Sequence, residues 1–270
     1  MYKFLRFPDW KDKAMTLSYD DCVVYDEQLI SIMQRYGLKG TFNINAGIKN
    51  DNRMDQKKAL ELYQNAGMEV AMHGFHHLMV TACMNSDIIH EFYQDKTELE
   101  DKFGNIIRGG AYAYGVCNEA SIQVIKTLGL SYFRTIYSTY KFDIPNNWLQ
   151  LNPTCHHKEN IMELFDEFVA EKPDKIYYKD AKLFYMWGHS YEFNDNNNWD
   201  VIEKFGEKVA ERKDIWHATN IEIYDYVKAY ENLIFSVKGD KVLNNSIHDV
   251  YFWVDGQNVL AKAGQLTKIG

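Results

Sequence analysis

The sequence predicts an α/β fold in which about seven strand–helix units form a closed or nearly closed (β/α)7-8 barrel. Short apolar runs alternate with segments of helical periodicity through the first 232 residues. This alternation is typical of parallel strands joined by crossover helices. Several of these runs end in polar residues, as in barrel enzymes. An open doubly wound sheet is the alternative, but no Gly-x-Gly-x-x-Gly follows the first strand, which disfavours its nucleotide-binding version.

Each predicted element has a local signal. The first helix has an apolar stripe from Leu29 to Tyr36 and a stop at Gly37, and Ser86 is a suitable N-cap for the longest helix. The predicted strands are 14–19, 40–45, 68–72, 106–112, 131–137, 183–187 and 215–218. The predicted helices are 29–36, 56–65, 86–103, 119–128, 161–169, 199–212 and 221–230.

The pattern changes after Asn232. The runs 233–238, 241–243, 250–254 and 258–261 are short and strand-like, and Gly239-Asp240 and Asp255-Gly256 indicate tight turns between them. Isolated hairpins are only marginally stable. We therefore predict a barrel over residues 1–232 and a small antiparallel β appendage over 233–270 that packs on it.

Composition limits the possible partners and compartment. The 270 residues include 46% hydrophobic residues, which is enough for a sizeable core, and the net charge of -8 argues against a nucleic-acid partner. No apolar run reaches the roughly 18 residues of a membrane span. The start of the chain shows no secretory signal, and the four cysteines are widely spaced. A cytoplasmic protein with reduced thiols is expected, with its oligomeric state open.

Asp20 and Asp21 are adjacent carboxylates at the end of the first predicted strand. The turn after the strand can bring both toward one pocket, where one binds a metal ion and the other stays free as a base. The alternative is that one of them caps the following helix.

His73 and His77 are four residues apart after the third predicted strand. On a helical turn they share a face, a spacing used for zinc. Gly74 stands where zinc proteases have their catalytic glutamate, so a base must come from elsewhere, and Asp20 is available. His76 is out of register with the pair. The alternative is that these are surface or core-edge histidines.

Tyr112, Tyr114 and Gly115 follow the fourth predicted strand. A glycine-containing turn there can aim a backbone N–H at an oxyanion, although an ordinary aromatic turn fits equally well. Tyr112 and Trp187 are candidates for substrate contact, since exposed aromatic rings stack on sugars, but core packing is the usual role of such rings.

His189 follows the strand predicted at 183–187. Histidine titrates near neutral pH, so it can protonate an amine leaving group, and Glu192 could orient it. A structural histidine is the alternative. The roles of His156, His157 and Arg108 are left open by the sequence.

These four stretches, in this order, resemble the polysaccharide deacetylases of carbohydrate esterase family 4. Ser18-Tyr19-Asp20-Asp21-Cys22 is similar to the family's Thr-Phe-Asp-Asp-Gly, and His73-Gly74-Phe75-His76-His77 matches its His-(Ser/Thr)-x-x-His. Ala111-Tyr112-Ala113-Tyr114-Gly115 aligns with Arg-x-Pro-Tyr-Gly, and Leu183 through His189 resembles the late histidine segment.

The resemblance implies a distorted barrel and a metal-dependent hydrolase that removes an acetyl group from an N-acetylated sugar or polysaccharide. Asp21, His73 and His77 would bind a divalent metal, usually zinc and sometimes cobalt. Asp20 would be the general base, and His189 the general acid. Tyr114 would supply a backbone N–H to the oxyanion.

The chain departs from the family pattern at Ala111, where the family has an arginine that steers the base, and at Ala113, where it has a proline. A missing arginine removes a positive charge that favours ionised Asp20. Two alternatives follow: a catalytically impaired carbohydrate-binding protein on the same scaffold, and a hydrolase of a non-sugar amide.

Overall fold

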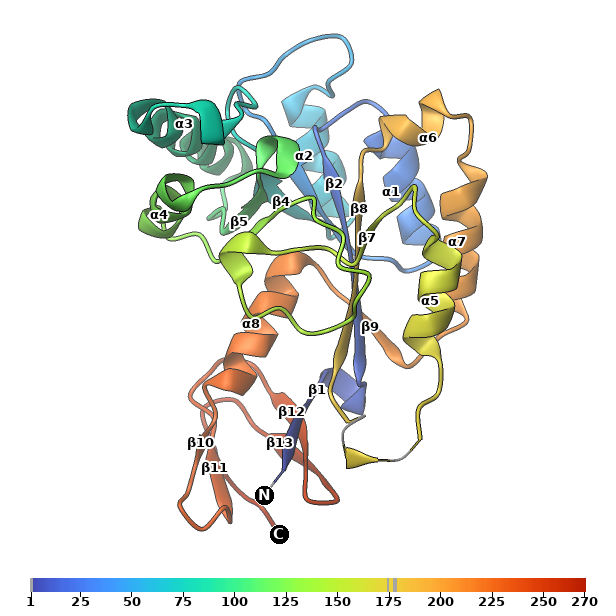
Figure 1. The fold of residues 1–270 in the computed structure, drawn as a ribbon, viewed down its shortest axis with the longest axis vertical. Coiled ribbons are helices and arrows are strands. Elements are labelled where there is room, and N and C mark those ends of the chain that lie inside the picture. Colours follow the sequence, from blue (N-terminus) through green and yellow to red (C-terminus); the bar gives the residue numbers. More distant parts are fainter. Residues whose placement is uncertain (1, 174, 177–178) are drawn as a thin grey trace.

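A computed structural model describes residues 2–173, 175–176 and 179–270 (Figure 1). Its main sheet is parallel and curls into a distorted barrel, which confirms the predicted fold class. The strand order is β6-β5-β4-β3-β2-β8-β7, and β9 also pairs with the first half of β2. The bounds are β2 Lys13–Asp20, β3 Gly40–Ile44, β4 Glu69–Met72, β5 Gly109–Ala111, β6 Tyr132–Arg134, β7 Cys155–His156, β8 Lys182–Gly188 and β9 Ile215–His217.

One irregular segment bridges the gap between the two end strands of this sheet. Leu151 forms a parallel bridge with Arg134 of β6, and Cys155 and His156 pair with β8 four residues later. The N–H of Thr154 donates to the carbonyl of Tyr185 at 2.8 Å. The chain therefore closes the barrel with a connecting loop where an open sheet would leave two edges.

Helices cover the outer face of the barrel and bury the larger apolar core against it (Figure 1). Helix α8 spans Asn220–Glu231, and its amino-terminal end closes the barrel at the end opposite the carboxyl ends of the strands. There the Asn220 amide donates to the Tyr185 hydroxyl at 2.9 Å. The other helices are α1 Asp26–Arg35, α2 Gln56–Asn65, α3 Asn85–Phe103, α4 Glu119–Thr127, α5 Ile161–Val169, α6 Tyr191–Asp195 and α7 Asp200–Ala210, with 3-10 turns η1 Pro8–Trp10, η2 Val80–Ala82, η3 Ala113–Gly115 and η4 Trp148–Gln150.

The chain after α8 forms two small antiparallel sheets with their own apolar cluster (Figure 1). They contain β10 Ile234–Phe235, β11 Lys241–Leu243, β12 Val250–Val254, β13 Gln257–Ala261 and β14 Leu266–Lys268. Asp255 and Gly256, both with positive φ, connect β12 to β13 as predicted. The amino-terminal strand β1, Lys3–Arg6, pairs with β12, so these first residues belong to the appendage sheet, unlike the 1–232 division that we predicted.

Two strands are shorter than predicted. The run 106–112 gives only Gly109–Ala111, and 131–137 gives only Tyr132–Arg134. The first of them ends shortly before the turn at Tyr114, where φ is 59° and outside the extended region. Apolar content alone extended both predictions past the last residue of each strand. The four cysteines are free, and none of the described helices is long and apolar enough to cross a membrane.

A buried carboxyl group joins α1 to the loop after β8. The hydroxyls of Ser190 and Tyr63 both donate to Asp26, and burial raises the pKa of Asp26 to about 7. Since a raised pKa favours the protonated form, the folded protein loses stability as pH rises through this value. Asp26→Asn has no ionisable group at this position, so it does not lose stability with pH there. At each pH we compare the melting temperature of Asp26→Asn with that of the unsubstituted protein. We expect the variant's melting temperature, measured against the unsubstituted protein, to be about 4 °C higher at pH 8 than at pH 5. Equal differences at both pH values would contradict this.

Candidate active site

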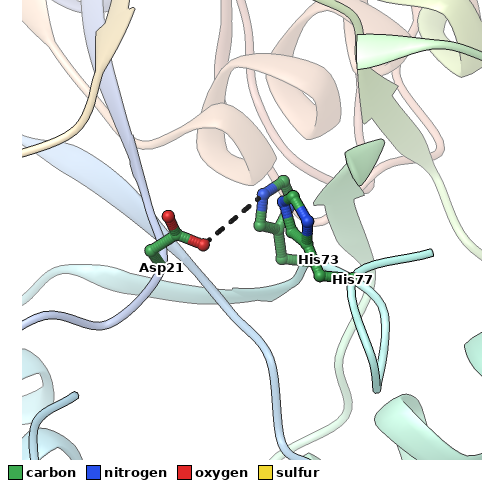
Figure 2. Close-up of side chains that lie close together, drawn as sticks. All are labelled: Asp21, His73 and His77. Carbon is green, nitrogen blue, oxygen red and sulfur yellow. Dashed lines mark ion pairs between the residues drawn. The ribbon is translucent and has the colours of Figure 1, made fainter. Parts of the chain in front are cut away.

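The carboxyl ends of the parallel strands bring the predicted site residues together. Asp20 ends β2, Asp21 follows it, His73 follows β4, and His189 follows β8. Asp21, His73 and His77 each offer one ligand atom, and these atoms lie within 4.8 Å of one another (Figure 2). The His73 Nε2 is 4.0 Å from the Asp21 Oδ1. Two imidazoles and one carboxylate are a common ligand set for catalytic zinc, so these residues fit a divalent cation.

Hydrogen bonding prepares His73 to be a ligand. Its Nδ1–H donates to the carbonyl of Ala111 at 2.9 Å, so Nε2 carries the free lone pair that faces Asp21. Burial and the neighbouring His73 lower the pKa of His77 to about 4, which keeps that ring neutral near pH 7. Metal binding requires neutral imidazoles. The His77 ring is therefore in the protonation state that a cation site requires.

Three site residues have a left-handed backbone. The φ angles are 86° at Asp21, 59° at His77 and 59° at Tyr114. Such angles are uncommon and unfavourable outside glycine, and they persist where surrounding contacts enforce them. Here they turn the chain sharply after β2, β4 and β5, which directs these residues into the site. Local sequence patterns carry little information about these turns.

Asp20 lies beside the triad and is almost fully buried. The amide of Asn43 donates to its Oδ1 at 2.8 Å, and the Nη2 of Arg134 donates to its Oδ2. Burial by itself would raise the pKa of Asp20, but Arg134, with smaller effects from His73 and His189, lowers it to about 2. Asp20 is thus held as a carboxylate.

Arg134 is one of the site residues that sequence reasoning missed. It ends β6, is fully buried, and its guanidinium carbon lies 4.3 Å from the ring centroid of Trp187. It supplies the positive charge that we expected to be lost with Ala111, but from the neighbouring strand. Arg108 instead pairs with Asp225 through two 2.7 Å hydrogen bonds. The available signal was a cation inside an apolar strand, Tyr132-Phe133-Arg134.

His189 is positioned between the two aspartates and Glu192. Its Nε2 lies 3.9 Å from an oxygen of Asp20 and of Asp21, and its Nδ1 lies 3.6 Å from the Glu192 Oε2. Burial would lower the pKa of His189, but these three carboxylates outweigh burial and raise it. This shift is toward the protonated form, which a proton donor requires.

Glu192 connects His189 to the two histidines whose role was open. The Nε2 atoms of His156 and His157 lie 3.2 and 2.9 Å from its Oε2, and the Lys158 ammonium is 2.6 Å from its Oε1. The N–H of Lys158 donates to the His156 Nδ1, so the His156 proton is on Nε2 and points at Glu192. This cluster fixes the carboxylate behind His189.

Two buried acids of α3 hold the loop that carries the histidines. Asp95 accepts hydrogen bonds from the N–H groups of His73 and Gly74, at 3.1 and 2.8 Å. Glu91, one turn earlier, accepts from the N–H groups of His76 and Leu78. A Cβ on Gly74 would lie 2.6 Å from Glu91, so glycine is required there. His76 itself points away from the triad, toward Glu91.

The structure does not support substrate contact by Tyr112. Its ring is 1% exposed and packs on Phe92 and Phe133, so it has no surface to offer a ligand. Trp187 is also buried, beneath Arg134. The exposed ring is that of Tyr114, which is 52% exposed and lies edge-on to His77 at 4.6 Å. Sequence alone could not separate the buried rings from the exposed one.

A cavity of about 420 Å³ adjoins the triad. Its lining includes Asp21, Arg53, Tyr25, Tyr191 and Asp195. The cavity therefore places polar and aromatic side chains next to one predicted metal ligand, Asp21.

Comparison with known proteins identifies one family to which this chain is similar. Residues 8–133 match the sequence pattern of the polysaccharide deacetylase family, which covers Asp20, Asp21, His73, His77 and Tyr114. These residues, slightly less than half of the chain, are similar to the polysaccharide deacetylase family. The resemblance drawn from the four motifs is thereby confirmed. A search of curated protein sequences gave no match.

The fold is shared with solved structures that align at TM-scores above 0.5. A Mycobacterium smegmatis protein assigned as a polysaccharide deacetylase aligns with a TM-score of 0.63 and 14% identity, over 84% of this chain and 94% of that one. A family 4 acetyl xylan esterase from Clostridium thermocellum, in complex with a cobalt ion, aligns with a TM-score of 0.52 and 12% identity, over 78% and 90%. The Streptococcus pyogenes deacetylase PplD aligns with a TM-score of 0.46 and 20% identity over 50% of this chain, which spans 61% of that protein.

Proposed function

We propose that this protein is a metal-dependent hydrolase that removes an acetyl group, or a related acyl group, from an N-acetylated sugar or polysaccharide. The observation that carries the proposal is the arrangement around Asp20. One aspartate joins two histidines in a ligand triad, while its neighbour is held outside the triad as a carboxylate by Arg134 and Asn43. The cobalt ion in the Clostridium thermocellum esterase structure supports a divalent cation, zinc or cobalt in particular.

Asp21, His73 and His77 would hold the cation. When bound, the cation would act as a Lewis acid that polarises the acyl carbonyl and lowers the pKa of the attacking water. Asp20 accepts the proton of that water, because its remaining lone pairs lie beside the triad.

The other two residues act on the oxyanion and the leaving group. The Tyr114 ring lies against the His77 ring, and the backbone N–H of Tyr114 is our candidate donor to the oxyanion. Protonated His189, oriented by Glu192, gives its proton to the departing sugar amine. Without that proton the amine would leave as an anion, which is unfavourable in water.

The two alternatives carry different weight. The impaired binding protein was motivated by the loss of the family arginine at Ala111, and Arg134 now occupies that role at Asp20. The alternative of a hydrolase that acts on a non-sugar amide stays open, since the triad and its proton donors would serve any small acyl amide. Only the substrate that is turned over distinguishes this alternative from a sugar deacetylase.

The experiment is acetate release by the chelator-treated protein, with and without added Zn²⁺ or Co²⁺. The substrates are N-acetylglucosamine oligomers and a simple aliphatic acetamide. We expect metal-dependent release from the oligomers, with little release from the acetamide. Release from the acetamide alone would favour the non-sugar alternative. No cation binding and no acetate from either substrate would refute the proposal.

A further inference from the structure

Arg53 contacts the same carboxylate that is proposed to bind the cation. Its Nη1 lies 2.9 Å from the Asp21 Oδ1 and also donates to the Asp21 carbonyl. Oδ1 is the oxygen that lies 4.0 Å from the His73 Nε2, whereas Oδ2 faces His189. The guanidinium therefore lies against the Asp21 oxygen that the ligand triad needs.

The backbone on both sides of this ion pair is fixed. The N–H of Val24 donates to the carbonyl of Asn52 at 3.1 Å, and the N–H of Met54 donates to the carbonyl of Cys22 at 2.8 Å. Val23 and Arg53 form an antiparallel bridge between these two hydrogen bonds. The turn at Asp21 is thus held by backbone pairing, and the Arg53 side chain is the part that can move.

The pair is largely shielded from water, because the two side chains are only 16% and 14% exposed. Charges in such a place are weakly screened by salt. A guanidinium at Asp21 therefore repels a divalent cation at the triad and occupies one of its ligand atoms. Both effects weaken cation binding.

The adjoining cavity provides a place for the displaced side chain. Arg53 lines it together with Asp195 and Tyr25, which offer a carboxylate and a hydroxyl as acceptors. A guanidinium that leaves Asp21 would enter the cavity where the substrate is expected to lie.

We propose that Arg53 is an internal competitor of the cation for the Asp21 carboxylate. Cation binding is then coupled to release of the guanidinium into the substrate cavity. The inference rests on the proposed metal site, but not on the identity of the substrate.

The test measures cation affinity without substrate, by titrating chelator-treated protein with Co²⁺ or Zn²⁺ against a competing dye. Arg53→Met is expected to bind the cation roughly tenfold more tightly than the unsubstituted protein, because a competitor is lost. Arg53→Lys keeps the charge and is expected to stay within about threefold of it. Lys57→Met removes an exposed charge from the first turn of α2 and should leave the affinity unchanged.

Unchanged or weaker binding by Arg53→Met would overturn the proposal, since Arg53 would then be a bystander or a support for Asp21. Tightening by Arg53→Lys equal to that of Arg53→Met would also overturn it. A melting curve confirms folding, and Arg53→Gln replaces Arg53→Met if that variant does not fold. Loss of binding in Asp21→Asn identifies the site. Absence of cation binding in every form would refute the metal site itself, a different outcome from a failed competition.

Discussion

Asp20→Asn is expected to lower kcat for acetate release by roughly 10³-fold while the protein still binds its divalent cation. Asparagine has the shape of aspartate and can accept the hydrogen bond from Asn43 through its carbonyl oxygen. It cannot take a proton from water, and loss of a general base typically costs 10²–10⁴-fold. The ligands Asp21, His73 and His77 are unchanged. The measurements are acetate release at saturating metal and bound Co²⁺ per chain.

The neighbouring residue provides the matched control. Asp21→Asn changes the same functional group one position along the chain, but within the proposed ligand set. It should lose both cation binding and activity. If the two variants behave alike in both measurements, the division of labour between the adjacent carboxylates is wrong. If Asp20→Asn keeps full activity, another residue is the base.

The sequence was sufficient to predict where the site lies. Parallel strands present their carboxyl ends at one edge, so polar residues after β2, β4, β5 and β8 had to meet there. Asp21, His73 and His77 do meet in the structure. This part of the prediction needed only strand–helix alternation and the position of each motif at the end of an apolar run.

The supporting residues could not be predicted in this way. Glu91 and Asp95 are one turn apart on α3 and read as an ordinary polar face, because nothing local shows that they accept hydrogen bonds from the loop after β4. Arg53 lies in a loop whose pairing with residues 22–24 depends on tertiary contacts. Whether a charged group is buried depends on the whole fold. The hydrophobic periodicity of a segment indicates only the average environment of that segment, so it does not identify such residues.

Arg134 shows how a family pattern can mislead when it is read one strand at a time. The family motif places an arginine at the position of Ala111 on β5, and the contact between Arg134 and Asp20 comes from β6. Ala111 and Arg134 are paired residues of these adjacent strands. The arginine of this chain therefore lies on the strand next to the one that carries it in the family motif. Ala111 and Arg134 are neighbours in the sheet but are 23 positions apart in the sequence.

Arg134→Met is expected to lower kcat/KM by roughly 10²-fold and also to destabilise the protein. The substitution leaves the buried Asp20 carboxylate without its cation, and breaking a buried ion pair from one side typically costs about 3–5 kcal/mol. Activity falls because Asp20 is no longer held in one orientation beside the triad, and small errors in position cost large factors in rate. Arg134→Lys keeps the charge but not the planar fork that reaches both Asp20 and the Thr135 carbonyl, so an intermediate loss is expected.

The control is Arg108→Met, which removes a bidentate arginine of the same barrel whose side chain is 39% exposed. Partly exposed pairs contribute about 1 kcal/mol or less, so its stability should change little and its kcat should be unchanged. The measurements are urea unfolding and steady-state acetate release for all three variants. If Arg134→Met affects activity no more than Arg108→Met does, the arginine on β6 is a structural cation, and the orientation of Asp20 must come from Asn43 alone.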